Sequence, residues 1–194
     1  ALIAHELAHS WSGNLVTNAT WNDFWLNEGF TVYFERRIME ALYGDEYANM
    51  LAVLGYQDLE AEVHHIGHQH SDTHLKLNLE GRDPDDGMTD IAYEKGAYFL
   101  MMLESKFGRP RFDKFLKDYF EEHKFQTITT NEFINYLNSN LLSETDEAID
   151  IDAWIFGPGL PGNLPIPSSD KFTKVDSALN AFYSASTLVD QTWS

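Results

Sequence analysis

His5-Glu6-Leu7-Ala8-His9 and Trp25-Leu26-Asn27-Glu28-Gly29 are the two stretches that decide how this chain folds. The first has the pattern H-E-x-x-H. On an α-helix, positions i and i+4 share one face, so His5 and His9 can aim both imidazoles at one point with Glu6 beside them. Two neutral imidazoles and a carboxylate that can accept a proton from water are typical of a catalytic zinc site. The pattern therefore predicts a helix over residues 1–12 that carries metal ligands.

Glu28 supplies the carboxylate that such a site still needs. H-E-x-x-H alone is short enough to arise by chance, as two unrelated histidines on a surface helix. A catalytic zinc takes three protein ligands and leaves one position open. Glu28 follows His9 after 18 residues and begins an apolar-periodic run, Phe30, Val32, Tyr33, Phe34, Ile38 and Met39. We therefore expect a second helix packed on the first, and one Zn²⁺ held by His5, His9 and Glu28.

Composition sets further bounds. The chain has 194 residues, 43% of them hydrophobic, which suits one domain or one domain with a short tail. Its net charge of −18 argues against binding nucleic acid, and the absence of cysteine excludes disulfides and a Cys-type zinc site. No run of 18 apolar residues is present, so we expect no membrane span.

The chain opens four residues before its first expected metal ligand. We therefore expect it to be part of a longer polypeptide whose remaining domains are its partners. No signal peptide is visible in these residues, and we expect a cytoplasmic location.

The rest of the chain reads as mainly α, with no convincing strands. Apolar periodicity and stop signals predict further helices over about 22–43, 45–67, 91–107, 112–120, 130–137, 146–156 and 168–190. Asn22 or Asp23 is expected to cap the second helix, Thr89 or Asp90 the one that follows residue 90, and Thr129 with Glu132 matches a capping box. Leu2, Ile3, Leu7 and Trp11 are expected to supply the apolar contacts of the first helix.

Residues 64–90 form the least regular stretch and contain five histidines, His64, His65, His68, His70 and His74. Their irregular spacing among Gly, Gln, Ser and Asp favours a solvated loop over a second metal site. After Gly157, the glycines and prolines predict a linker. We expect residues 1–160 to belong to a catalytic domain, and residues 161–194 to be a proline-rich linker and helix that lead to another domain.

Three segments carry a family resemblance: His5 to Val16, Trp21 to Phe30, and Tyr93-Glu94-Lys95-Gly96. They resemble the gluzincin zinc aminopeptidases, the family of aminopeptidase N and leukotriene A4 hydrolase. Asp83-Pro84-Asp85 and the segment Trp154 to Pro161 resemble most the leukotriene A4 hydrolase branch, which includes bacterial aminopeptidases. The resemblance implies the helical C-terminal part of a thermolysin-like zinc metallopeptidase catalytic domain.

The resemblance also implies roles for single residues. His5, His9 and Glu28 would bind zinc, Glu6 would be the general base, and Tyr93 would donate a hydrogen bond to the oxyanion. Without the resemblance, Tyr93 would be an ordinary aromatic residue at a helix start. Three further residues match substrate-pocket positions: Asp85, Phe24 and Leu77. Glu35 is a candidate partner of a zinc histidine, with a solvated helix face as the alternative.

Two features depart from the family pattern. The Gly-x-Met-Glu-Asn motif, whose glutamate holds the substrate's free amino group, does not occur in these residues; in the family it lies upstream of the zinc helix. Met88 stands where the leukotriene-converting enzyme has a tyrosine, which argues against an epoxide hydrolase activity.

The resemblance implies a zinc-dependent aminopeptidase that hydrolyses the N-terminal peptide bond of a peptide substrate. Two alternatives remain open at this point. A thermolysin-type endopeptidase shares the His-His-Glu plan. A zinc-binding module without activity of its own would fit residues that lack the amine-anchoring motif.

Overall fold

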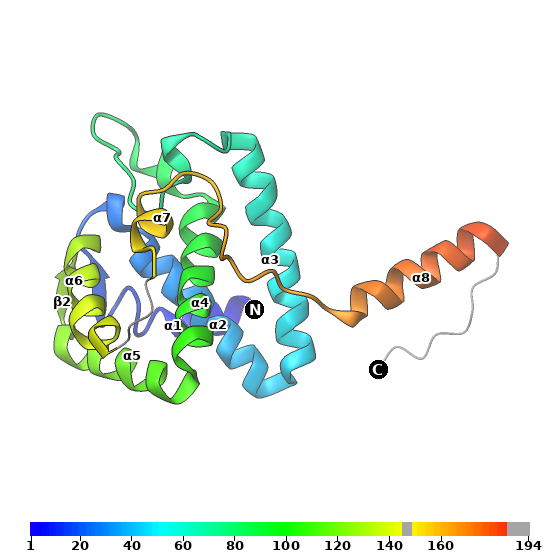
Figure 1. The fold of residues 1–194 in the computed structure, drawn as a ribbon, viewed down its shortest axis with the longest axis horizontal. Coiled ribbons are helices and arrows are strands. Elements are labelled where there is room, and N and C mark those ends of the chain that lie inside the picture. Colours follow the sequence, from blue (N-terminus) through cyan, green and yellow to red (C-terminus); the bar gives the residue numbers. More distant parts are fainter. Residues whose placement is uncertain (145–148, 186–194) are drawn as a thin grey trace.

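The computed structural model describes residues 1–144 and 149–185, and this part of the chain is mainly helical, as predicted (Figure 1). The helices are α1 (Leu2–Ala8), α2 (Trp25–Tyr43), α3 (Asp45–Ile66), α4 (Gly96–Phe107), α5 (Arg109–His123), α6 (Thr130–Asn140), α7 (Ile151–Ile155) and α8 (Asp170–Ala185). Short turns connect them: η1 (Trp21–Asp23), η2 (Ser71–Thr73), η3 (Pro84–Gly87), the π-helical η4 (Ile91–Lys95) and η5 (Leu142–Glu144).

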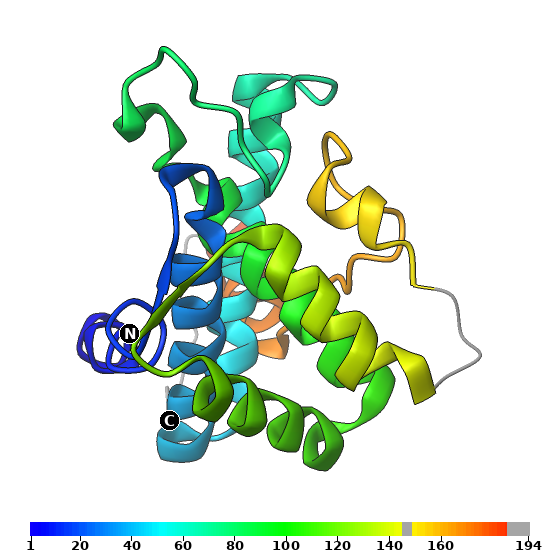
Figure 2. The same cartoon turned by 90° about the vertical axis from the view of Figure 1, so that its left-hand side faces the viewer.

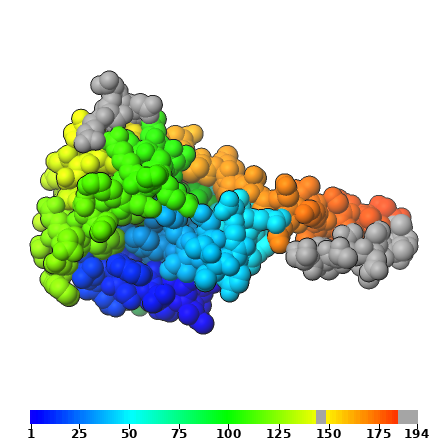
Figure 3. Space-filling model, turned by 90° about the horizontal axis from the view of Figure 1, so that it is seen from below, coloured from blue at the N-terminus to red at the C-terminus, as the bar shows by residue number. Residues whose placement is uncertain are grey.

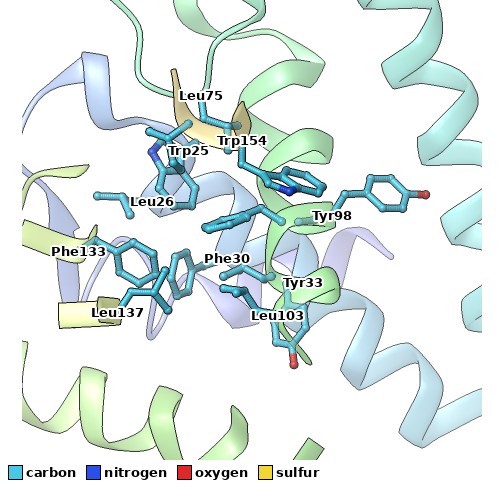
Figure 4. Packing of buried hydrophobic residues seen from close by; sticks show 14 of the residues in the cluster. Trp25, Leu26, Phe30, Tyr33, Leu75, Tyr98, Leu103, Phe133, Leu137 and Trp154 are labelled. Carbon is cyan, nitrogen blue, oxygen red and sulfur yellow. The ribbon is translucent and has the colours of Figure 1, made fainter. Parts of the chain in front are cut away.

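Helix α2 is the centre of the fold. It packs against α1, α3, α4 and η4, and Figure 4 shows its aromatic side chains meeting those of α4, α6 and α7. Trp25 and Phe30 are fully buried, and the ring of Phe133 from α6 lies edge-on to both of them. A helix buried on several sides has apolar residues around most of its circumference. Burial of α2 therefore fixes the position of Glu28, which it carries.

Two glycines let the start of α4, directly after the turn η4, approach α2 closely. A Cβ atom added at Gly29 would lie 2.8 Å from the Cα of Gly96, and one at Gly96 would lie 2.9 Å from the Cα of Gly29. A side chain at either position would force the two backbones apart. The crossing brings the turn that contains Tyr93 beside the first turns of α2.

The structure adds a small parallel sheet that the sequence did not predict. Strands β1 (Val16–Asn18) and β2 (Gln126–Ile128) pair with Thr17 opposite Thr127. Each strand has only three residues, too few to show a period of two, and the partners lie far apart in the sequence. The pairing joins the α1–α2 connection to the α5–α6 connection, at the side of the molecule shown in Figure 2.

Several helix ends differ from the predictions. Neither Asn22 nor Asp23 caps α2, so that cap prediction is wrong. Asp90, one of the two predicted candidates, is the N-cap residue of η4, but its side chain makes no capping hydrogen bond. Helix α4 ends at Phe107, as predicted, and Pro110 lies in the first turn of the following helix α5, where a missing N–H costs nothing. The capping box of Thr129 and Glu132 is confirmed. Residues 146–148 and 186–190 of the predicted helices lie outside the described residues.

The prediction for α1 is corrected in two ways. The helix ends at Ala8, followed by turns, and its buried residues are Ala4 and Ala8. The four residues expected to make apolar contacts are instead exposed by 43–86%: Leu2, Ile3, Leu7 and Trp11. The two histidines face α2, so the large apolar residues lie on other faces of a helix that runs along the surface (Figure 3).

The segment after α7 leads away from the helical body. It continues through an extended stretch into α8, which projects from the rest of the chain (Figure 1). Lys171 and Lys174 of α8 each lie 4.0 Å from a carboxylate oxygen of Glu46 on α3. The division into a catalytic domain and a linker remains a prediction. Within the described residues, no helix is long and apolar enough to cross a membrane.

Asp23 does not cap a helix because its carboxylate joins three separate segments. It is fully buried, lies 2.5 Å from Nζ of Lys76, and accepts hydrogen bonds from the backbone N–H and the hydroxyl of Thr130 and from the hydroxyl of Thr20. Burial alone would raise the pKa of Asp23, but these donors outweigh it and the pKa is lowered.

We expect Asp23→Ala to lower the free energy of unfolding by about 3 kcal/mol, because it leaves a lysine and three other donors without their partner. Denaturant unfolding measures the loss. The lowered pKa means that the carboxylate's contribution is present above its unfolded pKa and is lost as the pH falls through the folded value. The difference between the two proteins should therefore shrink in strong acid. Asp118→Ala, which removes an exposed carboxylate paired with Lys114, is the control and should cost less than about 1 kcal/mol.

Candidate metal centre

His5, His9 and Glu28 meet at the contact between α1 and α2. Each offers one ligand atom, and these atoms all lie within 4.8 Å of one another. Oε2 of Glu28 lies 3.2 Å from Nε2 of His5 and 3.7 Å from Nε2 of His9. The two imidazole rings stand nearly perpendicular, with centroids 4.9 Å apart. The structure therefore brings together the three residues that the sequence predicts as ligands.

The other ring nitrogen of His5 is held by Glu35. Nδ1 of His5 lies 3.0 Å from Oε2 of Glu35, which stands seven residues beyond Glu28 on α2. When a metal ion occupies the site, a carboxylate at Nδ1 would keep the proton on that atom and leave the lone pair of Nε2 free for the metal. Glu35 thus has the position expected of a partner that orients a metal-binding histidine.

His9 is oriented by groups that the sequence analysis did not single out. Its Nδ1 lies 3.0 Å from the carbonyl oxygen of Ser12, 3.1 Å from Oδ1 of Asn27 and 3.2 Å from Oγ1 of Thr31. Gly13 makes room for this arrangement: its φ is +114°, and an added Cβ would lie 2.9 Å from Oδ1 of Asn27. The sequence could have indicated Asn27 and Thr31 by their positions, because they lie close to Glu28 in the same helix.

The chemistry of these atoms fits a divalent cation. Oε2 of Glu28 is buried and has no hydrogen-bond partner among the described residues. A buried carboxylate oxygen without a donor is costly unless a cation lies beside it. The carboxylates of Glu28 and then Glu35 also raise the pKa of His5 to about 9, so the side chains alone attract positive charge. Two imidazoles and one carboxylate match the ligands of catalytic zinc.

Tyr93 lies beside the metal ligands. Its ring stacks on that of His5 with centroids 6.2 Å apart, and the ring of Phe24 lies edge-on to it at 5.9 Å. Burial raises the pKa of Tyr93 to about 12, with smaller contributions from the charges of Glu28, Asp90 and Glu6. The phenol therefore keeps its proton at neutral pH and can donate a hydrogen bond.

The remaining predicted site residues lie at different distances from this group. Glu6 is exposed on α1 between the two histidines, and its charge acts on Tyr93. Leu77 is buried, and its backbone N–H donates to the carbonyl oxygen of Asn22, two residues before Phe24. Asp85 is exposed in η3, which packs near η1. Among the contacts of the described residues, none joins Leu77 or Asp85 directly to the histidines.

The histidine-rich stretch at the end of α3 and after it does not form a comparable group. The rings of His64 and His68 are 6.3 Å apart. Within residues 1–144 and 149–185, His5, His9 and Glu28 make up the one group of three metal-type ligands that lies close enough to share an ion. The absence of a second metal group among the described residues agrees with the prediction, but the loop prediction is wrong for His64 and His65, which lie in the last turn of α3.

Glu35→Gln should weaken zinc binding by about tenfold or more, because the neutral amide polarises His5 less and fixes its ring less firmly. Competition with a chromogenic chelator measures the affinity. Glu40→Gln is the matched control: Glu40 lies near the C-terminal end of α2 and pairs with Arg109, so this variant should bind zinc as the wild type does. Equal affinities for all three proteins would show that Glu35 does not support the metal centre.

The model of the peptidase family M1 domain matches residues 1–154. The chain belongs to peptidase family M1, which confirms the family that the motifs indicated. It is 46% identical over 174 residues to leucine aminopeptidase 2 of Aspergillus terreus, covering 87% of this chain and 28% of that protein. It is 44% identical over 173 residues to a leukotriene A-4 hydrolase homolog of Botryotinia fuckeliana, covering 87% of this chain and 27% of that protein.

Solved structures agree with this assignment. The fold matches yeast LTA4 hydrolase in complex with bestatin with a TM-score of 0.83 and 36% identity, over 94% of this chain and 29% of that one. It matches a mutant M1 zinc metallopeptidase of Deinococcus radiodurans, bound to a Tyr-Ser-Ala substrate, with a TM-score of 0.66 and 28% identity, over 86% of this chain and 34% of that one. The chain thus spans less than a third of the length of the curated relatives described above.

Proposed function

We propose that this chain carries the zinc centre of an aminopeptidase, which removes amino-terminal residues from peptides. The observation that supports the proposal best is the orphaned, buried Oε2 of Glu28, which lies between Nε2 of His5 and Nε2 of His9. Relatives over this region include proteins named leucine aminopeptidase 2, and a structural neighbour is an M1 zinc metallopeptidase bound to a tripeptide.

Each polar side chain around the centre has a distinct task in this proposal. His5, His9 and Glu28 hold the zinc ion, which when bound acidifies water and polarises the carbonyl of the scissile bond. Glu6 takes a proton from the attacking water and passes it to the leaving amine. Tyr93 donates a hydrogen bond to the oxyanion that develops on the carbonyl oxygen, and its raised pKa keeps the proton available.

Three further residues are assigned to substrate binding. Phe24 lies against Tyr93 and would contact the first side chain of the peptide. Leu77, whose backbone N–H donates to the carbonyl oxygen of Asn22, would contact the same side chain. Asp85 lies in the neighbouring turn η3 and would line the same region. Acidic side chains near the centre that do not bind the metal, Glu6 and Asp90, favour a substrate that carries a positive amino terminus.

Hydrolysis of a free and a blocked substrate tests the proposal. The full-length protein should hydrolyse leucine p-nitroanilide, should leave N-acetyl-leucine p-nitroanilide intact, and should lose its activity to a zinc chelator. Cleavage inside amino-blocked peptides would instead support the thermolysin-type endopeptidase. Zinc bound at one equivalent without any hydrolysis would support the alternative of an inactive zinc-binding module.

A further inference from the structure

Lys95 is a fully buried lysine that the proposed chemistry does not use. Its side chain is 0% exposed, and its Nζ donates to the carbonyl oxygen of Thr73 at 2.7 Å and to that of Gly157 at 3.0 Å. Neither acceptor carries a charge. Burial lowers the pKa of Lys95 to about 7, which shows the cost of placing an ammonium group here. A methionine of similar length would avoid that cost. We therefore ask what the two hydrogen bonds of the amine connect.

The amine joins three segments that are distant in the sequence. Lys95 ends the turn η4, Thr73 lies in η2 after α3, and Gly157 follows α7. Thr73 strengthens the junction: its hydroxyl accepts from the backbone N–H of Gly159 at 2.7 Å and donates to the carbonyl oxygen of His70 at 2.7 Å. We name this set, Lys95, Thr73, Gly157 and Gly159, the Lys95 clamp.

The clamp is one part of a closed series of contacts that connects Tyr93 with the proposed substrate pocket. One residue, Glu94, separates Lys95 from Tyr93 within the π-helical turn. From Thr73 the chain runs on to Leu77, whose N–H donates to the carbonyl oxygen of Asn22 at 3.1 Å.

The series of contacts returns to Tyr93 through Asn22 and Phe24. The N–H of Leu79 donates to Oδ1 of Asn22 at 2.9 Å, so a second bond holds the same loop to η1. Phe24 lies two residues after Asn22 in the sequence, and its ring lies against that of Tyr93. The position of Leu77 relative to Tyr93 is therefore set from two sides, by the bonds of its loop to Asn22 and by the connection through Lys95 and Thr73.

We propose that Lys95 is a positioning residue that sets the spacing between Tyr93 and the Leu77 loop, and so determines the size of the first peptide side chain that the enzyme accepts. The inference rests on the proposed aminopeptidase function. Without the clamp, Thr73 loses its bond to η4, and the loop from Thr73 to Leu79 is held beside Phe24 only by its own bonds, such as those to Asn22, so it is less closely packed against Phe24 and Tyr93. A large side chain then loses more contact than a small one.

Substrate preference separates this role from a general loss of stability. The full-length zinc enzyme and its Lys95→Met variant are compared by kcat/KM on leucine p-nitroanilide and alanine p-nitroanilide. We expect the leucine-to-alanine ratio to fall by about tenfold, the discrimination that a few methylene groups in an apolar pocket provide. An unchanged or increased ratio overturns the inference. A variant that is merely less folded loses active enzyme, which lowers both values by the same factor.

Two further variants complete the experiment. Lys174→Met removes an exposed lysine of α8 and is the matched control, with an expected ratio equal to that of the wild type. Thr73→Val keeps the carbonyl that Lys95 binds but removes both bonds of the hydroxyl, and should lower the ratio by about threefold. If Lys95→Met does not fold, Thr73→Val decides the question: a lower ratio supports the clamp, and an unchanged ratio overturns it.

Wild-type turnover and zinc content, measured first, test the proposed function separately. A zinc enzyme with an unchanged substrate ratio in the variants refutes only the role of Lys95.

Discussion

Replacement of Glu6 by Gln is expected to lower kcat by about 10³-fold while one zinc ion stays bound to each chain, because the loss of a general base costs a factor of this order. Glu6 lies on α1 between the two histidines and is exposed, so the amide that replaces it creates no buried defect. The amide cannot accept the proton of the attacking water. Steady-state kinetics on leucine p-nitroanilide and metal analysis by mass spectrometry measure the two quantities on the same sample.

The control for this variant is Glu46→Gln, which neutralises a glutamate at the start of α3. It changes the net charge by the same amount and should leave kcat unchanged. Near-normal turnover of Glu6→Gln would remove Glu6 from the mechanism. A loss of turnover that accompanies a loss of zinc would assign Glu6 to the metal centre instead of proton transfer.

Tyr93→Phe should lower kcat by about 10²-fold to 10³-fold with a small change in KM, because a donor aimed at the developing oxyanion acts mainly in the transition state. The phenylalanine keeps the ring contacts with His5 and Phe24, so the packing around the metal ligands should survive. Full kinetic curves separate kcat from KM.

Tyr43→Phe provides the matched control, since that tyrosine is 64% exposed at the far end of α2. It should behave as the wild type. If Tyr93→Phe raises KM and leaves kcat intact, the hydroxyl binds the ground state of the substrate, and the proposed role at the oxyanion is wrong.

The spacing of His5, His9 and Glu28 made the metal centre predictable from sequence. A helix places residues four apart on one face, and the apolar run after Glu28 indicated a second buried helix beside it. The same reasoning gave Glu35, because seven residues make about two turns. Tyr93 could be placed only through the family resemblance, since nothing local distinguishes it from other aromatic residues at helix starts.

Other features depend on contacts between distant parts of the chain. Asp23 resembles a helix cap in sequence, yet its partners Thr130 and Lys76 come from α6 and from the loop after α3. The apolar residues of α1 indicated a buried helix, but α1 turns its histidines toward α2 and leaves Leu2 and Ile3 exposed. In a helix as short as α1, the positions of the apolar residues alone did not show which face meets the neighbouring helix.

Zinc stoichiometry in the purified full-length protein tests the central claim most directly. Inductively coupled plasma mass spectrometry should find one zinc ion per chain in the wild type, none in Glu28→Ala, and one in Glu46→Ala. Wild-type protein that remains free of metal after zinc is supplied would contradict the account, as would Glu28→Ala that retains its zinc.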